Sequence, residues 1–303
     1  MTVATARSVS VVIPTRGRPE ALSRAVRSVR AQSVEASEIV VVQDGPCPET
    51  AALVESGALG AIRHLVHDER RGGSAARNSG IAAAKGDLIA LLDDDDEFLP
   101  TKIERQLFAF ENQLACIAAS RFVERSRAGE TVCPRALPQP RQAIGDYLFV
   151  RKGLFRGEAE VQTSTLMAPK SLFDEVRFDE QLRRHQDWDW VLRAAQIAPL
   201  VYIPDALTIR NRTPSATRVK ARSVDSLAWI DQMRPLVGDR AYSAFLLTVV
   251  SRLAADERSF SLLPTILRKA FGAGPRLVDL VRMPAFWALS PAVRDRLRHL
   301  VHH

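Results

Sequence analysis

The run of four aspartates at residues 93–96 is the segment of this sequence with the clearest chemical content. Like charges a few ångströms apart raise one another's pKa and destabilise a fold unless a cation lies among them. Mg²⁺ and Mn²⁺ are the expected cations, because both prefer oxygen ligands and Mg²⁺ typically binds one or two carboxylates together with substrate phosphates. The alternative is an acidic loop exposed to water.

The residues that precede this run predict the elements that position it. Short aliphatic or β-branched runs at 9–13, 39–42, 62–66 and 88–92 alternate with helical patterns. This alternation is typical of a parallel sheet with crossover helices, and the continuous apolar runs predict strands covered on both faces.

Three helices are expected in the same part of the chain. One begins near Pro19 and places apolar side chains on one face, a second covers 74–84, and a third follows a capping-box spacing of Thr101 and Glu104 and ends near Asn112. The apolar face of the first helix consists of Leu22, Ala25, Val26 and Val29.

Three polar groups follow three of the predicted strands. Pro14 to Arg16 follow the first, Gln43 to Gly45 follow the second, and the aspartates follow the fourth. Because ligands of open α/β sheets bind at the carboxyl ends of the strands, we expect these groups to meet at one edge and to form a ligand site.

The rest of the chain is less regular at first and then helical. Residues 113–210 are mixed, with few periodic features between 123 and 160, where we expect a loop, and with a helix at 187–196. Beyond 217 the pattern is helical, at 222–236 and 240–256, followed by shorter pieces separated by prolines.

Composition limits the class of protein. The 303 residues are 46% hydrophobic and 25% charged, which is typical of a folded globular chain. No apolar run is long enough to span a bilayer, and the three cysteines are widely spaced, so we expect reduced thiols in a cytoplasmic protein. Residues 262–303 contain seven basic and two acidic residues and thus five of the seven net positive charges.

Four segments in order resemble the signatures of family-two glycosyltransferases, which have the GT-A fold. They are Ser10-Val-Val-Ile-Pro-Thr15, Val41-Val-Gln-Asp-Gly45, Gly72-Gly-Ser-Ala-Ala-Arg-Asn-Ser-Gly-Ile81 and Leu92-Asp-Asp-Asp-Asp96. The resemblance covers roughly residues 8–217. It implies an α/β GT-A domain with a Rossmann-like nucleotide-binding sheet, followed by a C-terminal α-helical appendage.

The resemblance also implies the donor site. Asp44 is expected to bind the nucleotide base, with Gln43 where a second acid is common, and Asp95 and Asp96 are expected to bind Mg²⁺ or Mn²⁺. A basic loop at 210–215 would cover the donor phosphates. The full set of expected nucleotide-binding residues is Pro14, Thr15, Arg18, Asp44, Gly73, Arg77, Asp93, Asp94, Asp95, Arg210 and Arg212.

The second half supplies the expected catalytic base. Phe178-Asp-Glu180 and His185-Gln-Asp-Trp-Asp-Trp190 resemble the family's FDE element and its acidic pair, with Asp187 as the base and Gln186 where Glu is usual. An inverting transfer needs a carboxylate within hydrogen-bond reach of the attacking hydroxyl. Asp187 could instead cap a helix. Asp189 is the second candidate base, and Trp188, Asp189 and Trp190 are expected to contact the acceptor.

These observations predict an enzyme, a metal-dependent inverting glycosyltransferase that moves one sugar from a nucleotide-diphosphate sugar, with a UDP-sugar favoured, to an acceptor hydroxyl. The acceptor would be a glycan or glycolipid in cell-envelope polysaccharide synthesis, and no nucleic acid is expected as a partner. Two alternatives stay open, a nucleotidyltransferase and a non-catalytic module that binds a nucleotide sugar or lipid. The expected domains are 1–217, with a nucleotide-binding half at 8–112 and an acceptor half at 113–217, and a helical region at 218–303.

Residues 262–303 form basic amphipathic pieces with two interpretations. Their apolar faces pack on the catalytic domain or on a second subunit of a homodimer, or they lie on an anionic membrane, where each basic side chain contributes about 1 kcal/mol. The second interpretation predicts a protein that is peripheral on the inner face of the membrane.

Overall fold

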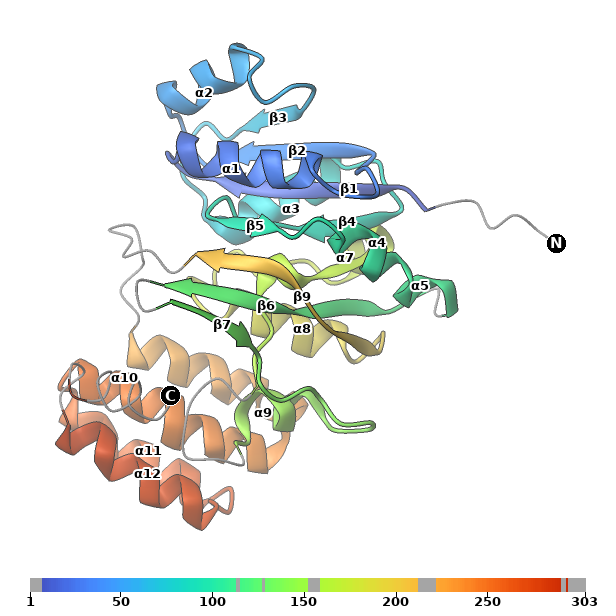
Figure 1. Ribbon diagram of the computed structural model, residues 1–303. Coiled ribbons are helices and arrows are strands. Elements are labelled where there is room, and N and C mark those ends of the chain that lie inside the picture. The colour runs from blue at the N-terminus through green and yellow to red at the C-terminus, as the bar shows by residue number, and fades with distance from the viewer. Residues whose placement is uncertain are drawn as a thin grey trace. The chain divides into compact units, whose positions relative to one another are not determined.

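A computed structural model describes residues 7–112, 115–126, 129–151, 159–211, 222–289 and 293 (Figure 1). The chain divides into two compact units, Met1–Pro134 with Val161–Ser215, and Arg135–Glu160 with Ala216–His303. The second unit therefore includes residues 135–160, which the sequence analysis assigned to the acceptor half of the first domain.

The first unit alternates strands and helices through the fourth strand, as predicted for the first hundred residues, and is less regular after it. Its strands are β1 (Val9–Thr15), β2 (Glu38–Gln43), β3 (Arg63–Val66), β4 (Leu88–Leu91), β5 (Asp96–Phe98), β6 (Ile117–Ser126), β7 (Gly129–Cys133), β8 (Met167–Pro169) and β9 (Leu200–Asn211). Its helices are α1 (Pro19–Arg30), α2 (Pro48–Glu55), α3 (Gly73–Ala83), α4 (Lys102–Leu107), α5 (Ala109–Asn112), α7 (Lys170–Glu175) and α8 (Gln186–Ala194), with a 3₁₀ turn at Thr163–Thr165.

The strands of this unit form one mixed sheet in the part of the chain that the structure describes. The order is β3-β2-β1-β4-β8-β6-β9-β5, with β7 paired to β6. Strands β1 to β4 are parallel, whereas β8 runs antiparallel to β4 and β5 antiparallel to β9. The chain passes from β4 to β5 through the aspartate run, so this run lies where the sheet changes from parallel to mixed.

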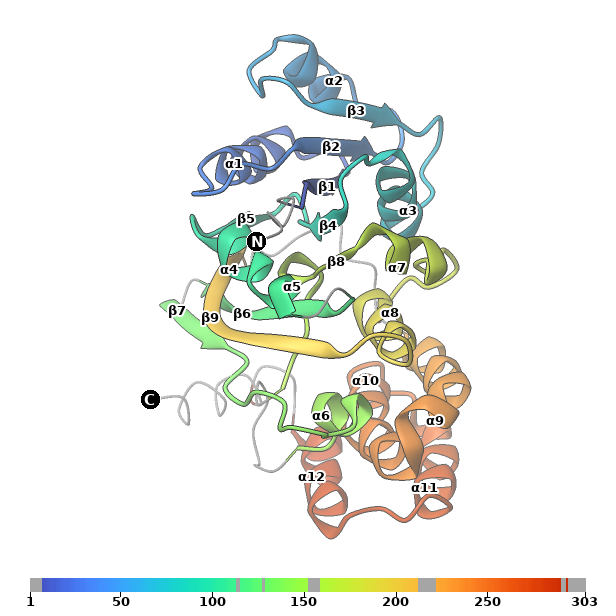
Figure 2. The same ribbon diagram turned by 90° about the vertical axis from the view of Figure 1, so that its right-hand side faces the viewer.

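Helices α1 and α3 lie on opposite faces of the β1–β2 region (Figure 2). The apolar face predicted for α1 is buried, and it packs with Val11, Ile13 and Val41 of the sheet in the main core. On the other face, Gly80 of α3 approaches β1 so closely that an added Cβ would lie 2.5 Å from Cγ1 of Val12. These contacts hold α1 and α3 against the two faces of β1 and β2.

The second unit is helical, as predicted. It contains α6 (Ile144–Phe149), α9 (Ser223–Phe245), a π-helical turn (Leu246–Val250), α10 (Ser251–Asp256), a 3₁₀ turn (Phe260–Leu262), α11 (Leu263–Phe271) and α12 (Leu277–Ala288). Helix α6 packs on α9, where the Phe149 ring meets Phe245 edge-on with ring centroids 4.9 Å apart. In the described part of the chain, no helix is long and apolar enough to span a membrane.

Several local expectations are wrong. Thr101 does not cap α4 with its side chain, and Glu104 instead accepts a hydrogen bond from Ser33 Oγ at 2.7 Å. Strand β3 is only half-buried, because it is the edge strand of the sheet. Within 123–160, the expected loop contains the end of β6, all of β7 and α6, so the absence of periodicity did not indicate an absence of structure.

Candidate active site

The four consecutive aspartates alternate between the interior and the surface. The side chains of Asp94 and Asp96 are buried, at 0% and 3% relative exposure, whereas those of Asp93 and Asp95 are 26% and 32% exposed. The run forms a turn between β4 and β5, closed by a hydrogen bond from the Asp96 backbone N–H to the Asp93 carbonyl at 3.0 Å. The run therefore presents the carboxylates of Asp93 and Asp95 to a ligand and directs the other two inward.

Asp94 is held by the last residue of β1 and by the segment that follows this strand. It accepts hydrogen bonds from Thr15 Oγ1 at 2.6 Å and from Arg18 Nε at 3.2 Å, and it also pairs with Nη2 of Arg18. Burial raises the pKa of Asp94 to about 6, although Arg18 and Thr15 oppose that rise. Thr15 and Asp94, both expected to bind the nucleotide, thus bind each other and join β1 to the aspartate run.

Asp96 is bonded inside the protein. Its Oδ2 accepts hydrogen bonds from Ser164 Oγ at 2.7 Å and from the Gln162 amide, and its Oδ1 accepts one from the Asn211 backbone at 3.3 Å. Burial and the neighbouring charge of Asp93 raise the pKa of Asp96 to about 7. This enclosure differs from the metal-ligand role that the sequence predicted for Asp96, because a ligand carboxylate needs oxygen atoms open to the cation.

Each of the two outward aspartates is paired with an arginine. Arg18 Nη1 lies 2.7 Å from Asp95 Oδ2, and Arg77 Nη2 lies 2.6 Å from Asp93 Oδ1. Arg77 also donates from Nη1 to Gln186 Oε1 at 2.9 Å. Arg77 therefore connects the aspartate run to the first residue of α8.

Asp44 anchors the loop that enters α3. Its carboxylate accepts hydrogen bonds from the backbone of Arg71 at 2.8 Å and of Gly72 at 2.9 Å, and it lies 3.2 Å from His67 Nδ1. Gly72 has a φ of 99°, a conformation that favours glycine. An added Cβ at Gly73 would lie 3.2 Å from Arg77 Nη1, so this glycine leaves room for the arginine bridge.

The FDE segment is bound to α3 by one asparagine. Asn78 Oδ1 accepts from the Phe178 backbone at 3.0 Å, and its Nδ2 donates to the Phe178 carbonyl at 2.9 Å and to Glu180 Oε1 at 3.0 Å. Sequence reasoning did not assign a role to Asn78, although it lies within the Gly72–Ile81 motif. Gln162 and Ser164 were also missed, and no pattern in the sequence connects them to the aspartate run.

Asp187 lies in the first turn of α8, where its Oδ1 accepts from the Trp188 backbone at 2.9 Å. The residue before the helix, His185, has a positive φ of 63°, and its ring stacks on Trp188 with centroids 5.0 Å apart. Asp187 and Trp188 are half-buried, so part of each is accessible to a substrate.

Asp189 and Trp190 face the interior. Asp189 is buried and pairs with Arg193, whose Nε lies 2.9 Å from Oδ2. Trp190 is fully buried, donates from Nε1 to the Val176 carbonyl and stacks on Phe173 with centroids 4.3 Å apart. The acceptor contact expected of Trp190 is therefore wrong, because the side chain is part of the core.

Arg210 lies in β9 opposite Asp96 in the strand register. Its guanidinium pairs with Glu124 and lies over the ring of Phe122, 4.6 Å from the centroid. Arg212, the other expected phosphate clamp, is outside the described residues. Pro14, also expected at the nucleotide site, is a partly buried residue of β1 paired with Val42.

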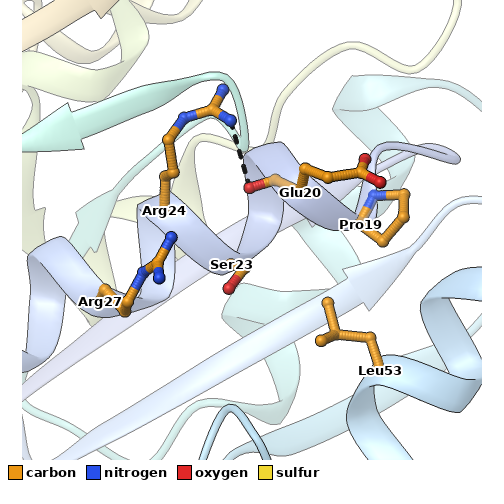
Figure 3. A pocket seen from close by; sticks show the side chains of 6 residues that line it. All are labelled: Pro19, Glu20, Ser23, Arg24, Arg27 and Leu53. Carbon is orange, nitrogen blue, oxygen red and sulfur yellow. Dashed lines mark hydrogen bonds between the residues drawn. The ribbon is translucent and has the colours of Figure 1, made fainter.

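A shallow hollow of about 340 Å³ lies between α1 and α2 (Figure 3). Along α1, Arg24 Nη1 donates to the Glu20 carbonyl at 3.3 Å. The residues that line the hollow are Pro19, Glu20, Ser23, Arg24, Arg27 and Leu53, and none of them belongs to the expected site.

Comparisons with known proteins identify the family of this chain. The model of the family described as "Glycosyl transferase family 2" matches residues 10–158. The amylovoran biosynthesis glycosyltransferase AmsB of Erwinia amylovora is 30% identical over 84% of this chain and 88% of its own length. The succinoglycan biosynthesis protein ExoU of Rhizobium meliloti is 29% identical over 64% of this chain and 58% of its own length.

Solved structures show the same fold. The crystal structure of S. aureus TarS 1-349 in complex with UDP-GlcNAc aligns over 93% of this chain and 87% of that chain, with a TM-score of 0.59 and 15% identity. The fold alone follows from this likeness, and it confirms the expected α/β GT-A architecture with C-terminal helices. Together with the AmsB match, these findings confirm that the chain is a glycosyltransferase enzyme that belongs to family 2.

Proposed function

We propose that this glycosyltransferase is a metal-dependent inverting enzyme that moves one sugar from a nucleotide-diphosphate sugar to an acceptor hydroxyl. The observation that supports it most is the Arg77 bridge, which connects Asp93 after β4 with Gln186, the residue before Asp187. A glycosyltransferase needs its donor-phosphate site and its general base next to each other. The Arg77 bridge joins the aspartate run to the start of α8, where Asp187 lies.

The outward aspartates fit a divalent cation. Asp93 and Asp95 are the two partly exposed carboxylates of the run, at 26% and 32%, so a cation from solvent can reach them. Among the residues that the structure describes, no group of three or more His, Cys, Asp or Glu side chains is placed to hold a metal ion. An open set of one or two carboxylates is what Mg²⁺ uses when substrate phosphates complete its shell. We therefore assign the cation, Mg²⁺ or Mn²⁺, to Asp95 with Asp93 beside it.

The bound cation would stabilise the departing diphosphate. Residues of the chain would bind and orient the donor phosphates. Arg18 and Arg77 supply positive charge at the same edge, and the backbone anchored by Asp44 orders Gly72 and Gly73 at the start of α3. A helix N-terminus favours anions, so this loop suits the phosphate end of the donor. We also propose that Asp44 binds the nucleobase of the donor, in addition to holding the loop before α3.

Asp187 is the proposed general base. Its partial exposure suits it to accept a proton from an attacking hydroxyl, whereas Asp189 is buried and pairs with Arg193. Attack by the hydroxyl on the face opposite the leaving diphosphate inverts the anomeric centre. Trp188, stacked on His185, is the proposed contact for the acceptor.

The relatives suggest the substrate class. AmsB and ExoU are named for the biosynthesis of amylovoran and succinoglycan, and TarS was solved with UDP-GlcNAc. We propose a UDP-sugar as donor and a growing glycan or glycolipid as acceptor, in the synthesis of an extracellular or cell-envelope polysaccharide. The site would be cytoplasmic, where nucleotide sugars are made.

A panel of nucleotide sugars tests this function. The proposal predicts that UDP-sugars raise the melting temperature with Mn²⁺ or Mg²⁺ and less in chelator, and that at least one releases UDP slowly by hydrolysis. A panel in which no nucleotide sugar stabilises the protein, with metal or without, would contradict the proposal. Asp179→Asn is a matched control for substitutions of an acid, because Asp179 lies outside the proposed donor site.

The position of the C-terminal helices is a separate proposal. In α12 the charged Asp279 and Arg282 are buried, whereas Leu277 and Val281 are 77% and 64% exposed. Asp279 pairs with both Arg276 and Arg282, and Asp231 pairs with Lys269. Three of the seven basic residues at 262–303 therefore have acidic partners. If the exposed face of α12 with Leu277 and Val281 contacts a second subunit, the protein should be a dimer in solution. If this face contacts a membrane, the protein should co-sediment with anionic vesicles.

A further inference from the structure

Arg18 binds two aspartates, Asp94 and Asp95, that differ in how far water solvates their carboxylates. Its Nε lies 3.2 Å from Asp94 Oδ2 and its Nη1 lies 2.7 Å from Asp95 Oδ2. Asp94 is fully buried, so a cation must stay with its charge, whereas the Asp95 side chain is 32% exposed and water also solvates it. The contact with Asp95 is therefore the one that Arg18 can give up at small cost.

The same contact conflicts with a cation at Asp95. Mg²⁺ lies about 2.1 Å from a carboxylate oxygen, and Mn²⁺ shares its preference for oxygen ligands. A dication at that distance would lie within a few ångströms of the guanidinium, and like charges so close repel strongly at a partly buried site. Binding of the divalent cation to Asp95 therefore weakens the contact between Asp95 and Arg18, and that contact in turn weakens binding of the cation.

We propose that Arg18 is the resident counter-ion of Asp95, that the divalent cation displaces its Nη1 from this carboxylate, and that the freed Nη1 then binds the diphosphate of the donor. The inference rests on the proposed function, since it needs a metal and a diphosphate at this edge. Arg18 stays anchored to buried Asp94 through Nε and Nη2, which limits the movement to one end of the guanidinium.

The exchange makes metal and nucleotide binding depend on each other. The cation alone must displace Arg18 from Asp95, whereas a cation that arrives with a diphosphate gives Arg18 a new anionic partner. Metal affinity is then low in the free enzyme and rises with UDP, and by linkage UDP affinity rises equally with metal. Part of this coupling comes from the direct attraction of metal and phosphate, so the effect of Arg18 has to be measured without nucleotide.

The test is Mn²⁺ binding to the nucleotide-free protein, measured by electron paramagnetic resonance. Arg18→Lys keeps a positive charge for Asp94, but a single ammonium group cannot span both carboxylates in the way the planar guanidinium does. We expect Arg18→Lys to bind Mn²⁺ up to about fivefold more tightly than the wild type, which corresponds to the roughly 1 kcal/mol of one partly exposed charge contact. Arg18→Gln is a second variant with the same expected direction, and thermal melting verifies that each variant is folded.

Arg24→Gln is the matched control, because Arg24 lies on α1, the helix that follows Arg18, and donates a hydrogen bond to the Glu20 carbonyl. It should leave the Mn²⁺ affinity unchanged, which separates the effect of the Asp95 contact from that of net charge. Mn²⁺ affinities of Arg18→Lys and Arg18→Gln equal to or weaker than the wild type would overturn the inference. Donor turnover, measured separately, tests the proposed function, so a failure of the exchange and a failure of the function are distinguishable.

Discussion

Nη1 of Arg77 donates a hydrogen bond of 2.9 Å to Oε1 of Gln186, which is the first residue of α8. The two residues are 109 positions apart in the chain. Since the other amino group of Arg77 binds Asp93, a neutral amide at 186 connects α8 to the aspartate run without competing for the arginine charge. A glutamate at this position would compete with Asp93 for that charge.

Gln186→Ala tests this bridge. The variant removes the contact between Arg77 and α8 but keeps the Arg77–Asp93 pair, so kcat should fall about tenfold, as expected when a positioning contact is lost, while donor KM changes little. Steady-state kinetics measures both constants. An equal loss of UDP–Mn²⁺ affinity would show that Gln186 supports the donor site rather than α8.

Asp187→Asn separates binding from chemistry. Removal of a general base should lower turnover by about 10² to 10⁴ while UDP affinity stays nearly unchanged. Asp189→Asn is the comparison, because it weakens the pair with Arg193 and should lower the melting temperature instead. Near-wild-type turnover of Asp187→Asn would mean that the base lies elsewhere.

Asp95→Asn and Asp96→Ala should fail in different ways. Asp95→Asn removes the exposed carboxylate, so we expect loss of Mn²⁺ binding with little change in stability. Asp96→Ala leaves the buried donors of Gln162 and Ser164 without an acceptor and should lower the free energy of unfolding by about 2 to 4 kcal/mol. Urea denaturation and Mn²⁺ titration of both variants measure the two effects. If the Asp96→Ala variant is as stable as the wild type but no longer binds Mn²⁺, Asp96 is a metal ligand, as the sequence predicted.

Lys102 makes stability depend on pH. It is fully buried, binds Gln106 and lies 4.2 Å from the centroid of the Phe98 ring, and burial lowers the pKa of Lys102 to about 7. Between that value and about 10.4, the usual lysine pKa, the unfolded chain holds a proton that the folded chain has released, so stability rises with pH.

Lys102→Met removes this dependence. Relative to the variant, the wild type should gain about 1.4 kcal/mol of unfolding free energy per pH unit between pH 7 and 10. Urea denaturation at pH 7, 8 and 9 measures the difference. A difference that is constant over this range would show that Lys102 keeps its proton in the folded protein.

The sequence predicted the parts of the site that depend on chain periodicity. The strand runs at 9–13 and 88–92 and the apolar face of α1 were enough to place Thr15 and the aspartates at one edge. A run of identical residues, however, cannot show which members face inward. The burial of Asp96 depends on Gln162 and Ser164, which are 66 and 68 residues away, and no local pattern links them.

The same limit applies to the second half of the chain. Trp188 and Trp190 are equivalent in sequence terms, yet one stacks on His185 and the other is enclosed by Phe173 and Phe178. The pairing of Arg210 with Glu124 depends on the parallel register of β6 and β9, which the short apolar pieces at 116–119 and 200–203 did not specify. Tertiary contacts, rather than propensity, decided these roles.

Calorimetric titration of UDP into the wild-type protein, in Mn²⁺ and in chelator, tests the central claim most directly. Without the cation, the diphosphate would face the exposed carboxylates of Asp93 and Asp95, whose arginine partners compensate one charge each. The account predicts affinity at least about tenfold higher in Mn²⁺ than in chelator, a difference of about 1.4 kcal/mol. Equal affinity under both conditions would contradict a metal-dependent donor site at this edge of the sheet.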